Sequence, residues 1–432
     1  MTSNPETANK NRSIWYGWVI LAVVFVIMSV MVGVRNSLGF FFKTVSGEFG
    51  WSRAQTAGAY SIGMLAQSIC SPIFGGMGER WSLRWMMAFG VFFGGAAFLI
   101  GSSVGGLFQF YLMYALLNVG FAASTFVPQV QILSNWFKKR RGLAMGIANS
   151  GQGFAAVLNL AVPFLIAWIG WRSSYLVLAG FTLIFIFPLA ALLLRDHPRD
   201  RGTVADAPFL NALERQALDD QDERLRSAGN AAPPGTAFLK KVFSTRFFCI
   251  AFTYSAIAFI ITGTTVHIVP HATDQGFSPE ASAIIFLIWG VCLFAGNLIS
   301  SMSDALGRAL TYAAGAVLGV FACVLLACFT QGMPQALFYA GAALSGIGLG
   351  LTRPTASALL ADNFAGPGFG KLNGSVMMIF ALFGALGSFA TGYLFDISGN
   401  YRGAFMLLAA VNLAGAATAI PLGRMSPQKA GR

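Results

Sequence analysis

The sequence predicts an all-α membrane protein, with twelve transmembrane helices in two pseudo-symmetric six-helix halves. Of its 432 residues, 56% are hydrophobic and 10% are charged, whereas about a quarter of a soluble domain is charged. Apolar runs of about 20 residues, the length that crosses a bilayer, recur along the whole chain. These features exclude a soluble enzyme, a disordered chain and a disulfide-stapled secreted module.

The apolar runs predict the individual helices and their orientation. An even number of helices places both termini on one side, and the loops on that side carry 22 of the 28 Lys and Arg residues. The excess of basic residues predicts cytoplasmic termini, and we expect a multi-pass protein of a bacterial inner (plasma) membrane. The expected spans are 15–42, 54–75, 86–105, 107–133, 143–169, 173–194, 246–270, 281–302, 309–330, 336–360, 372–395 and 403–423.

An internal repeat divides the chain into two similar parts. Gly50-Trp51-Ser52 returns as Gly276-Phe277-Ser278, 226 residues later, and Glu79 returns as Asp304 after 225 residues. We therefore expect an N-terminal half at 1–194, a cytoplasmic central loop at 195–245 that acts as a solvated linker, and a C-terminal half at 246–432. Paired halves of this kind hold a substrate at their interface and work by alternating access.

Several segments carry a family resemblance. They are YGW at 16–18, EFGWSRAQTA at 48–57, GGMGERWSLRW at 75–85, SNWFKKRRGLAMGIANSG at 134–151 and GYLFDISGNYRGAF at 392–405. With them the chain resembles the major facilitator superfamily (MFS), and more specifically its monocarboxylate transporter and oxalate/formate antiporter branch.

The resemblance implies the MFS fold, organic-anion transport and a cytoplasmic gate of charged loop residues, here Glu79, Arg80, Arg84, Asp304 and Arg308. The chain departs from the branch in span eight, which lacks the Asp/Arg pair of animal monocarboxylate carriers.

The charges inside the expected spans indicate the substrate. None of the 16 Asp and Glu residues falls in the middle of a span, whereas Arg353 lies inside span ten and Arg35 lies in the outer third of span one. An Arg at the centre of a span costs about 2.5–3.5 kcal/mol on insertion scales, and its planar guanidinium matches a carboxylate. We expect Arg35 or Arg353 to bind substrate carboxylate, and one small anion is not expected to touch both at once. The alternatives are that Arg35 reaches the outer lipid headgroups and that Arg353 pairs with a helix C-terminus or with Asp362 as a gate.

Polar side chains at helical spacing predict the rest of the site. Tyr114, Asn118 and Gln129 recur on one face of span four, and Gln152 lies on a polar face of span five. We expect these four to line the substrate path, with hydrogen bonding between helices as the alternative. His267 is the candidate for proton coupling, because imidazole titrates near neutral pH; a histidine that only forms hydrogen bonds is the alternative.

The sequence therefore predicts a secondary active transporter of a small organic anion, a monocarboxylate, by proton symport or anion exchange. The alternatives are an MFS exporter of a larger amphipathic compound and a transporter-like sensor. No nucleophile–base arrangement, metal-ligand spacing or clustered basic face occurs, so we expect no enzyme activity, cofactor, metal or nucleic-acid partner. The expected partners are the organic anion and the lipid bilayer, and we expect a monomer.

Overall fold

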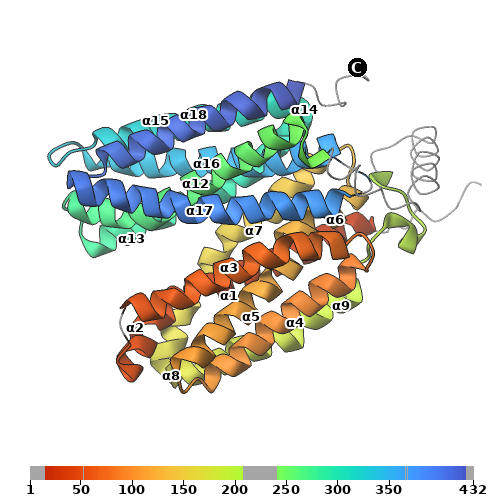
Figure 1. Cartoon of the computed structure of the whole chain (residues 1–432), viewed down its shortest axis with the longest axis horizontal. Coiled ribbons are helices and arrows are strands. Elements are labelled where there is room, and N and C mark those ends of the chain that lie inside the picture. Colours follow the sequence, from red (N-terminus) through yellow and green to blue (C-terminus); the bar gives the residue numbers. More distant parts are fainter. Residues whose placement is uncertain (1–14, 52, 208–240, 365, 367, 425–432) are drawn as a thin grey trace, which may run out of the picture.

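A computed structural model describes residues 15–51, 53–207, 241–364, 366 and 368–424, and within them every regular element is a helix. Figure 1 shows two bundles side by side, one coloured red to yellow-green and the other green to blue. The first contains α1 (Tyr16–Asn36), α2 (Leu38–Phe49), α3 (Arg53–Met77), α4 (Leu83–Ser102), α5 (Leu107–Ser124), α6 (Phe126–Trp136), α7 (Arg141–Asn159), α8 (Ala161–Phe181), η1 (Thr182–Ile186), α9 (Phe187–Leu193) and η2 (Pro198–Arg201). The second contains α12 (Thr245–Asp274), α13 (Pro279–Ile299), η4 (Ser300–Met302), α14 (Ser303–Leu306), α15 (Arg308–Cys328), α16 (Gln335–Phe364), α17 (Phe369–Ser398) and α18 (Arg402–Arg424).

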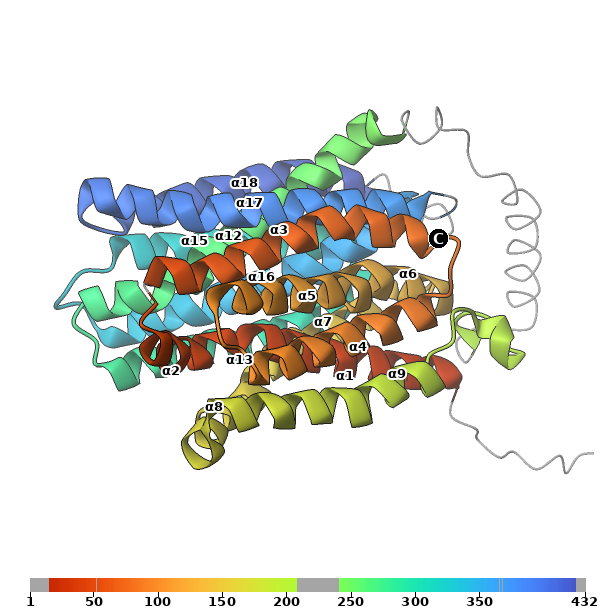
Figure 2. The same cartoon turned by 60° about the horizontal axis from the view of Figure 1, so that its bottom comes forward.

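Most of these helices suit a bilayer. In the described residues, ten helical runs are long and apolar enough to cross a membrane. The segment α8–α9 is the most exposed of them and runs along the outside of the first bundle (Figure 2), which fits a lipid-facing position. The helices α3 and α7 are not among the ten. Both contact the second bundle, and a helix that packs against protein needs less apolar surface than one that faces lipid.

Two expected spans are broken where the sequence analysis predicts continuous helices. The span at 15–42 is interrupted between α1 and α2, and the span at 107–133 is interrupted at Thr125, whose ψ of −122° is not helical. Helix periodicity does not reveal these two breaks, because the residues on both sides remain apolar. Gly170, at φ 75°, turns the chain between the expected spans 143–169 and 173–194.

The beginning of the expected central linker is packed rather than free. The Trp136 indole donates to the Arg195 carbonyl at 2.8 Å, and the buried Asp206 carboxylate accepts from the backbone N–H groups of Lys138 and Lys139 at 2.5 and 2.6 Å. Burial raises the pKa of Asp206 above its usual range. Residues 195–207 therefore bind the end of α6 and the connection that precedes α7, while 208–240 lie outside the described residues.

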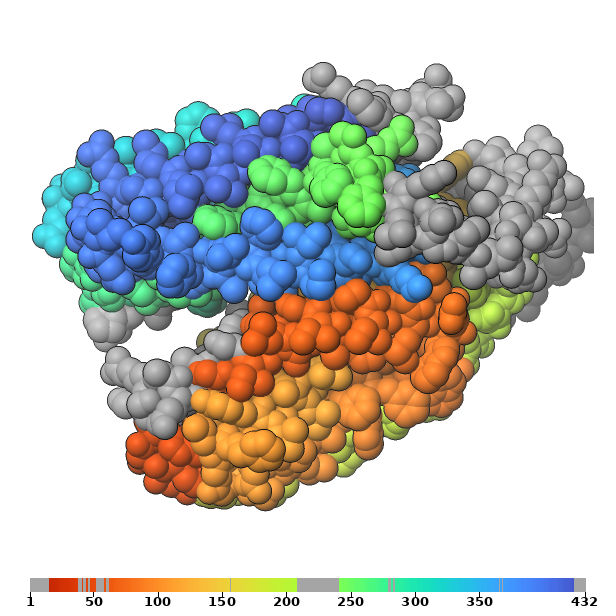
Figure 3. All heavy atoms as spheres, in the orientation of Figure 1, coloured from red at the N-terminus to blue at the C-terminus, as the bar shows by residue number. Residues whose placement is uncertain are grey.

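The two bundles meet at one end and separate at the other. We call the end with the connections 78–82, 137–140 and 194–207 the loop end, and the end with 103–106, 329–334 and 399–401 the open end. Figure 3 shows α3 against α17 towards the loop end, and a hollow between the bundles at the open end. The backbones touch at the loop end, since a Cβ on Gly75 would overlap the carbonyl oxygen of Gly370, and a Cβ on Gly146 would overlap that of Asn297.

Candidate functional site

Arg353 is buried where the two bundles meet. It lies on α16 with 6% of its surface exposed, and its Nη1 donates to Oε1 of Gln152 on α7. Its guanidinium lies 4.2 Å from the ring centre of Phe126 and 5.1 Å from that of Phe380. Arg353 therefore contacts both bundles, and its neighbours are one neutral amide and two aromatic faces.

Arg35 has a matching environment in the first bundle. Its Nη1 donates to Oε1 of Gln67 at 3.0 Å, and its guanidinium lies 4.2 Å from the ring centre of Phe121. Its Nε is buried without a hydrogen-bond partner. The guanidinium is therefore turned toward α3 and α5, inside the bundle, and not toward lipid headgroups.

Two touching rings connect the arginines. The ring centres of Phe121 and Phe126 are 5.7 Å apart at an interplanar angle of 70°. Phe121 contacts the guanidinium of Arg35, and Phe126 contacts that of Arg353. In the described part of the chain, no carboxylate lies within ion-pair distance of either arginine. Asp362, the alternative partner of Arg353, instead binds Arg141 and Arg308. Neutral amides and aromatic rings therefore contact both guanidinium groups, and neither positive charge is neutralised by a described carboxylate.

Of the other polar residues of the predicted path, some lie near the arginines and one does not. Gln129 follows Phe126 by three residues on α6, and both of its amide atoms are buried without a partner. Asn118 precedes Phe121 by three residues on α5, and its Oδ1 also lacks a partner. Residues three apart are neighbours on a helix face, so both lie beside the aromatic pair. Tyr114 instead packs against Phe110 inside the first bundle.

Sequence reasoning missed the aromatic supports and a tyrosine behind Arg353. The hydroxyl of Tyr254, on α12, donates to Ser357 Oγ at 3.1 Å, and Ser357 Oγ donates to the carbonyl of Arg353 at 3.2 Å. Tyr254 also contacts Phe380 edge to face. With 40 Phe residues in the chain, no sequence signal singles out the rings that touch an arginine.

His267 lies apart from the arginines. Its Nε2 contacts the Ser388 carbonyl at 3.0 Å, and its Nδ1 contacts the Tyr401 hydroxyl at 3.2 Å. Because a carbonyl only accepts, Nε2 carries the proton and Nδ1 accepts from the hydroxyl in the neutral ring. His267 follows Tyr254 by 13 residues on α12, roughly 20 Å along the helix.

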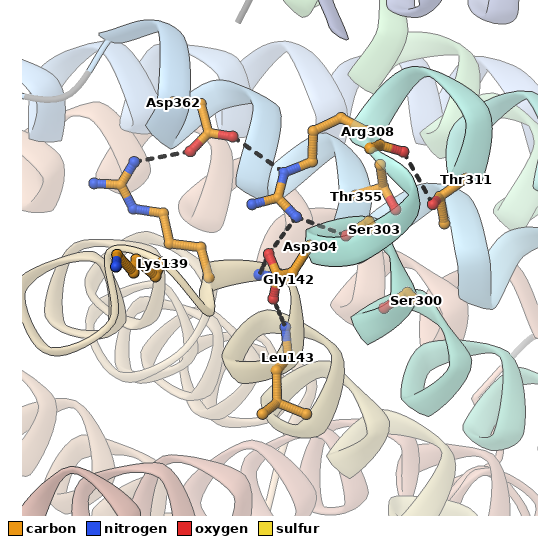
Figure 4. A network of polar contacts seen from close by, with 12 residues as sticks. Lys139, Gly142, Leu143, Ser300, Ser303, Asp304, Arg308, Thr311, Thr355 and Asp362 are labelled. Carbon is orange, nitrogen blue, oxygen red and sulfur yellow. Dashed lines mark hydrogen bonds and ion pairs between the residues drawn. The ribbon is translucent and has the colours of Figure 1, made fainter. Parts of the chain in front are cut away.

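Two carboxylates join the bundles at the loop end. Asp304 accepts from the N–H groups of Gly142 and Leu143, both at 2.9 Å, at the start of α7 (Figure 4). Glu79 accepts from the N–H groups of Gly368 at 3.2 Å and Lys371 at 3.0 Å, at the start of α17. These repeat-related residues therefore each cap a helix N-terminus of the opposite bundle, where a negative charge is stabilised.

The basic residues of the predicted gate behave differently from one another. Arg308, 2% exposed, binds Asp304 at 2.6 Å and Asp362 at 3.1 Å (Figure 4). Asp362 also binds Arg141 of the first bundle at 2.8 Å. Arg84 stays within its own bundle, where its Nε donates to the Ala191 carbonyl at 2.5 Å. Arg80 is exposed. Of the three predicted cations, only Arg308 joins the described contacts between the bundles, and it does so through Asp304 and Asp362, which bind residues of the first bundle.

The comparisons identify the family. The family model of the Major Facilitator Superfamily matches residues 19–302 and 291–431. The chain belongs to the major facilitator superfamily. Human monocarboxylate transporter 11 is 27% identical over 438 residues, covering 98% of this chain and 86% of the relative. Rat monocarboxylate transporter 13 is 26% identical over 417 residues, covering 94% and 89%.

Solved MFS structures share the fold. FucP in the outward conformation aligns with a TM-score of 0.69 at 12% identity, covering 94% of this chain and 99% of that one. The proton:xylose symporter XylE aligns with a TM-score of 0.74 at 15% identity, covering 93% and 94%. The predicted MFS fold, the multi-pass membrane character and the resemblance to monocarboxylate transporters are confirmed. The protein is an MFS transporter and not an enzyme; its bacterial origin and cytoplasmic termini stay predictions.

Proposed function

We propose that this MFS protein is a secondary active transporter of a small organic anion of the monocarboxylate class, working by alternating access. The observation that carries the proposal is the environment of Arg353, which is buried at the junction of the bundles without a described carboxylate partner. A carboxylate supplies the charge that the protein leaves out, and it fits the planar donors of a guanidinium. The similarity to monocarboxylate transporters supports the same class.

The proposed cycle begins with the carrier open to the outside. The excess of basic residues at the loop end supports a cytoplasmic position for that end, and the hollow at the open end then admits the anion. Arg35 and Asn118 lie on the open-end side and line the way to Arg353, and Gln129, three residues beyond Phe126 toward the loop end, lines the path beyond it. Glu79 and Asp304 act as the cytoplasmic gate, which opens when the two halves rock. Either a proton, with His267 as the carrier, or a counter-anion completes the cycle.

Uptake into liposomes tests this proposal. The reconstituted protein is supplied with radiolabelled lactate, pyruvate, oxalate or formate, with and without a pH gradient. We expect uptake of a monocarboxylate that falls strongly in Arg353→Ala and in Arg35→Ala but not in Arg402→Ala, whose arginine is exposed at the open end. Uptake of hydrophobic cations without any carboxylate would contradict the proposal in favour of an exporter.

The same assay separates the two forms of coupling. Uptake driven by an inward proton gradient indicates symport, and uptake that requires an internal anion indicates exchange. A His267→Ala protein that keeps its full response to the gradient would exclude His267 as the proton carrier.

A further inference from the structure

We propose that Gln152 is an internal ligand of Arg353, which holds the guanidinium while the carrier is empty and is displaced by the substrate carboxylate. The inference rests on the proposed anion transport and changes the expected role of Gln152. The sequence predicts a residue that binds substrate directly, whereas here it acts through Arg353. Gln152 is then a positioning residue that competes with the substrate.

The surroundings of Arg353 limit how an anion can reach it. Phe126 and Phe380 lie 4.2 and 5.1 Å from the guanidinium carbon, so an acceptor must approach along an edge that the rings leave open. Oε1 of Gln152 already takes the Nη1 donor. Nη1 has two N–H groups, and a carboxylate that binds end-on needs one of them together with one from Nη2. In our proposal Gln152 accepts from the N–H group of Nη1 that faces Nη2, so amide and carboxylate compete for it. Arg353 already forms a charge-assisted hydrogen bond with the neutral amide. A carboxylate adds the attraction of opposite charges and a second parallel hydrogen bond, and it therefore replaces the amide.

Gln152 is held in place by its own bundle. Its Nε2 donates to Oδ1 of Asn149 at 3.2 Å, and Nδ2 of Asn149 donates to the Met145 carbonyl at 2.8 Å. A Cβ on the next residue, Gly153, would lie 2.7 Å from Cβ of Phe294 on α13. The helix α7 therefore lies against the second bundle at this level, and Gln152 reaches Arg353 across a tight interface.

The hydrogen bond between Arg353 and Gln152 couples substrate binding to the movement of the two halves. Arg353 belongs to α16 of the second bundle and Gln152 to α7 of the first, so their hydrogen bond links the two halves beside the site. In the empty carrier the amide satisfies a buried cation, whose unpaired state would be costly. When a carboxylate takes its place, this link is lost, and the halves are freer to move against each other.

Replacing Gln152 distinguishes a competitor from a direct ligand by the sign of the effect. Equilibrium binding of radiolabelled pyruvate and lactate is measured on the purified full-length protein. We expect Gln152→Ala to tighten binding about three- to tenfold, because an internal hydrogen bond to a charged group no longer competes. Gln152→Glu should weaken it about tenfold or more, because a fixed carboxylate saturates Arg353. Gln335→Ala and Gln335→Glu, made at an exposed residue of α16, should change nothing.

The outcomes separate this inference from the proposed function. If the unaltered protein binds carboxylates and Gln152→Ala weakens binding or leaves it unchanged, the inference is wrong and the transport proposal stands. If the unaltered protein binds no carboxylate, the proposed function fails and the inference fails with it. Should Gln152→Glu not fold, the Ala variant still decides by the direction of its effect.

Discussion

At the scale of residues, neutral groups stabilise the two interior guanidinium groups without cancelling their charge. A hydrogen bond to a charged group contributes about 1.5–3 kcal/mol, and a desolvated cation–π contact contributes about 2 kcal/mol. Gln152 with two rings, and Gln67 with one, can therefore offset the insertion cost, which is about 2.5–3.5 kcal/mol for an arginine. The positive charge therefore remains available to bind an anion. A carboxylate of the protein in the same place would have neutralised it.

A second charged group, at the open end, makes a prediction about pH. Glu48 accepts from Arg172 at 2.5 Å and from the Trp171 indole at 2.6 Å, and these two partners, Arg172 first, hold the pKa of Glu48 below its usual range. A carboxyl with a lowered pKa stabilises the fold above its ordinary pKa and loses this effect as the pH falls through the lowered value. We expect Glu48→Gln to lower the thermal midpoint slightly at pH 7.

The pH series checks the cause of that effect. Because protonated Glu48 resembles the glutamine, the two melting curves should converge on acidification below the ordinary pKa of glutamate, about 4.3. A difference that persists at acid pH would show that packing, and not the ion pair, is responsible.

At the scale of elements, glycines bring the two bundles into backbone contact at the loop end. A Cβ on Gly370 of α17 would overlap the Gly75 carbonyl oxygen of α3, whereas Gly290 of α13 has no atom within 4 Å of such a position. We expect Gly370→Ala to destabilise the closed loop end by about 1–3 kcal/mol, the usual cost of overpacking. Gly290→Ala should be neutral or slightly stabilising, because Ala favours a helix. Thermal melting of both variants measures the contrast, and equal effects would contradict this account of the interface.

The helices also show which parts of the fold and of the candidate site could be predicted from the sequence. The lengths of the apolar runs and the internal repeat were sufficient to predict the transmembrane helices. The repeat also predicted that Glu79 and Asp304 occupy equivalent positions in the two halves. The breaks at Ser37 and Thr125 were missed because apolar residues continue across them. Arg35 and Arg353 stood out because charge is rare inside a span, whereas Phe121, Phe126 and Phe380 could not be distinguished from other aromatic residues.

At the scale of the whole molecule, two related caps hold the loop end shut. Glu79 binds the start of α17 and Asp304 binds the start of α7, and one such cap contributes about 0.5–2 kcal/mol. The double variant Glu79→Gln/Asp304→Asn should therefore shift the population toward carriers that are open at the loop end. Asp274→Asn, at an exposed residue of the open end, serves as the control.

Distances across the open end measure this shift. Spin labels at Phe108 and Met333, exposed residues at the open ends of opposite bundles, should move closer in the double variant as the hollow closes. The native cysteines are replaced first, so that only these two sites are labelled. Unchanged distances would show that the caps do not set the conformation.

The central claim is that a buried, uncompensated Arg353 binds the carboxylate of the substrate. The most direct measurement is the equilibrium dissociation constant of pyruvate and of lactate for the purified protein and for Arg353→Gln, with Arg402→Gln as the matched control. Loss of one partner from a buried, hydrogen-bonded charge pair costs about 2–5 kcal/mol, so we predict that affinity falls about 30-fold or more in Arg353→Gln and stays unchanged in the control. Carboxylate binding that survives Arg353→Gln at its original strength would contradict the account.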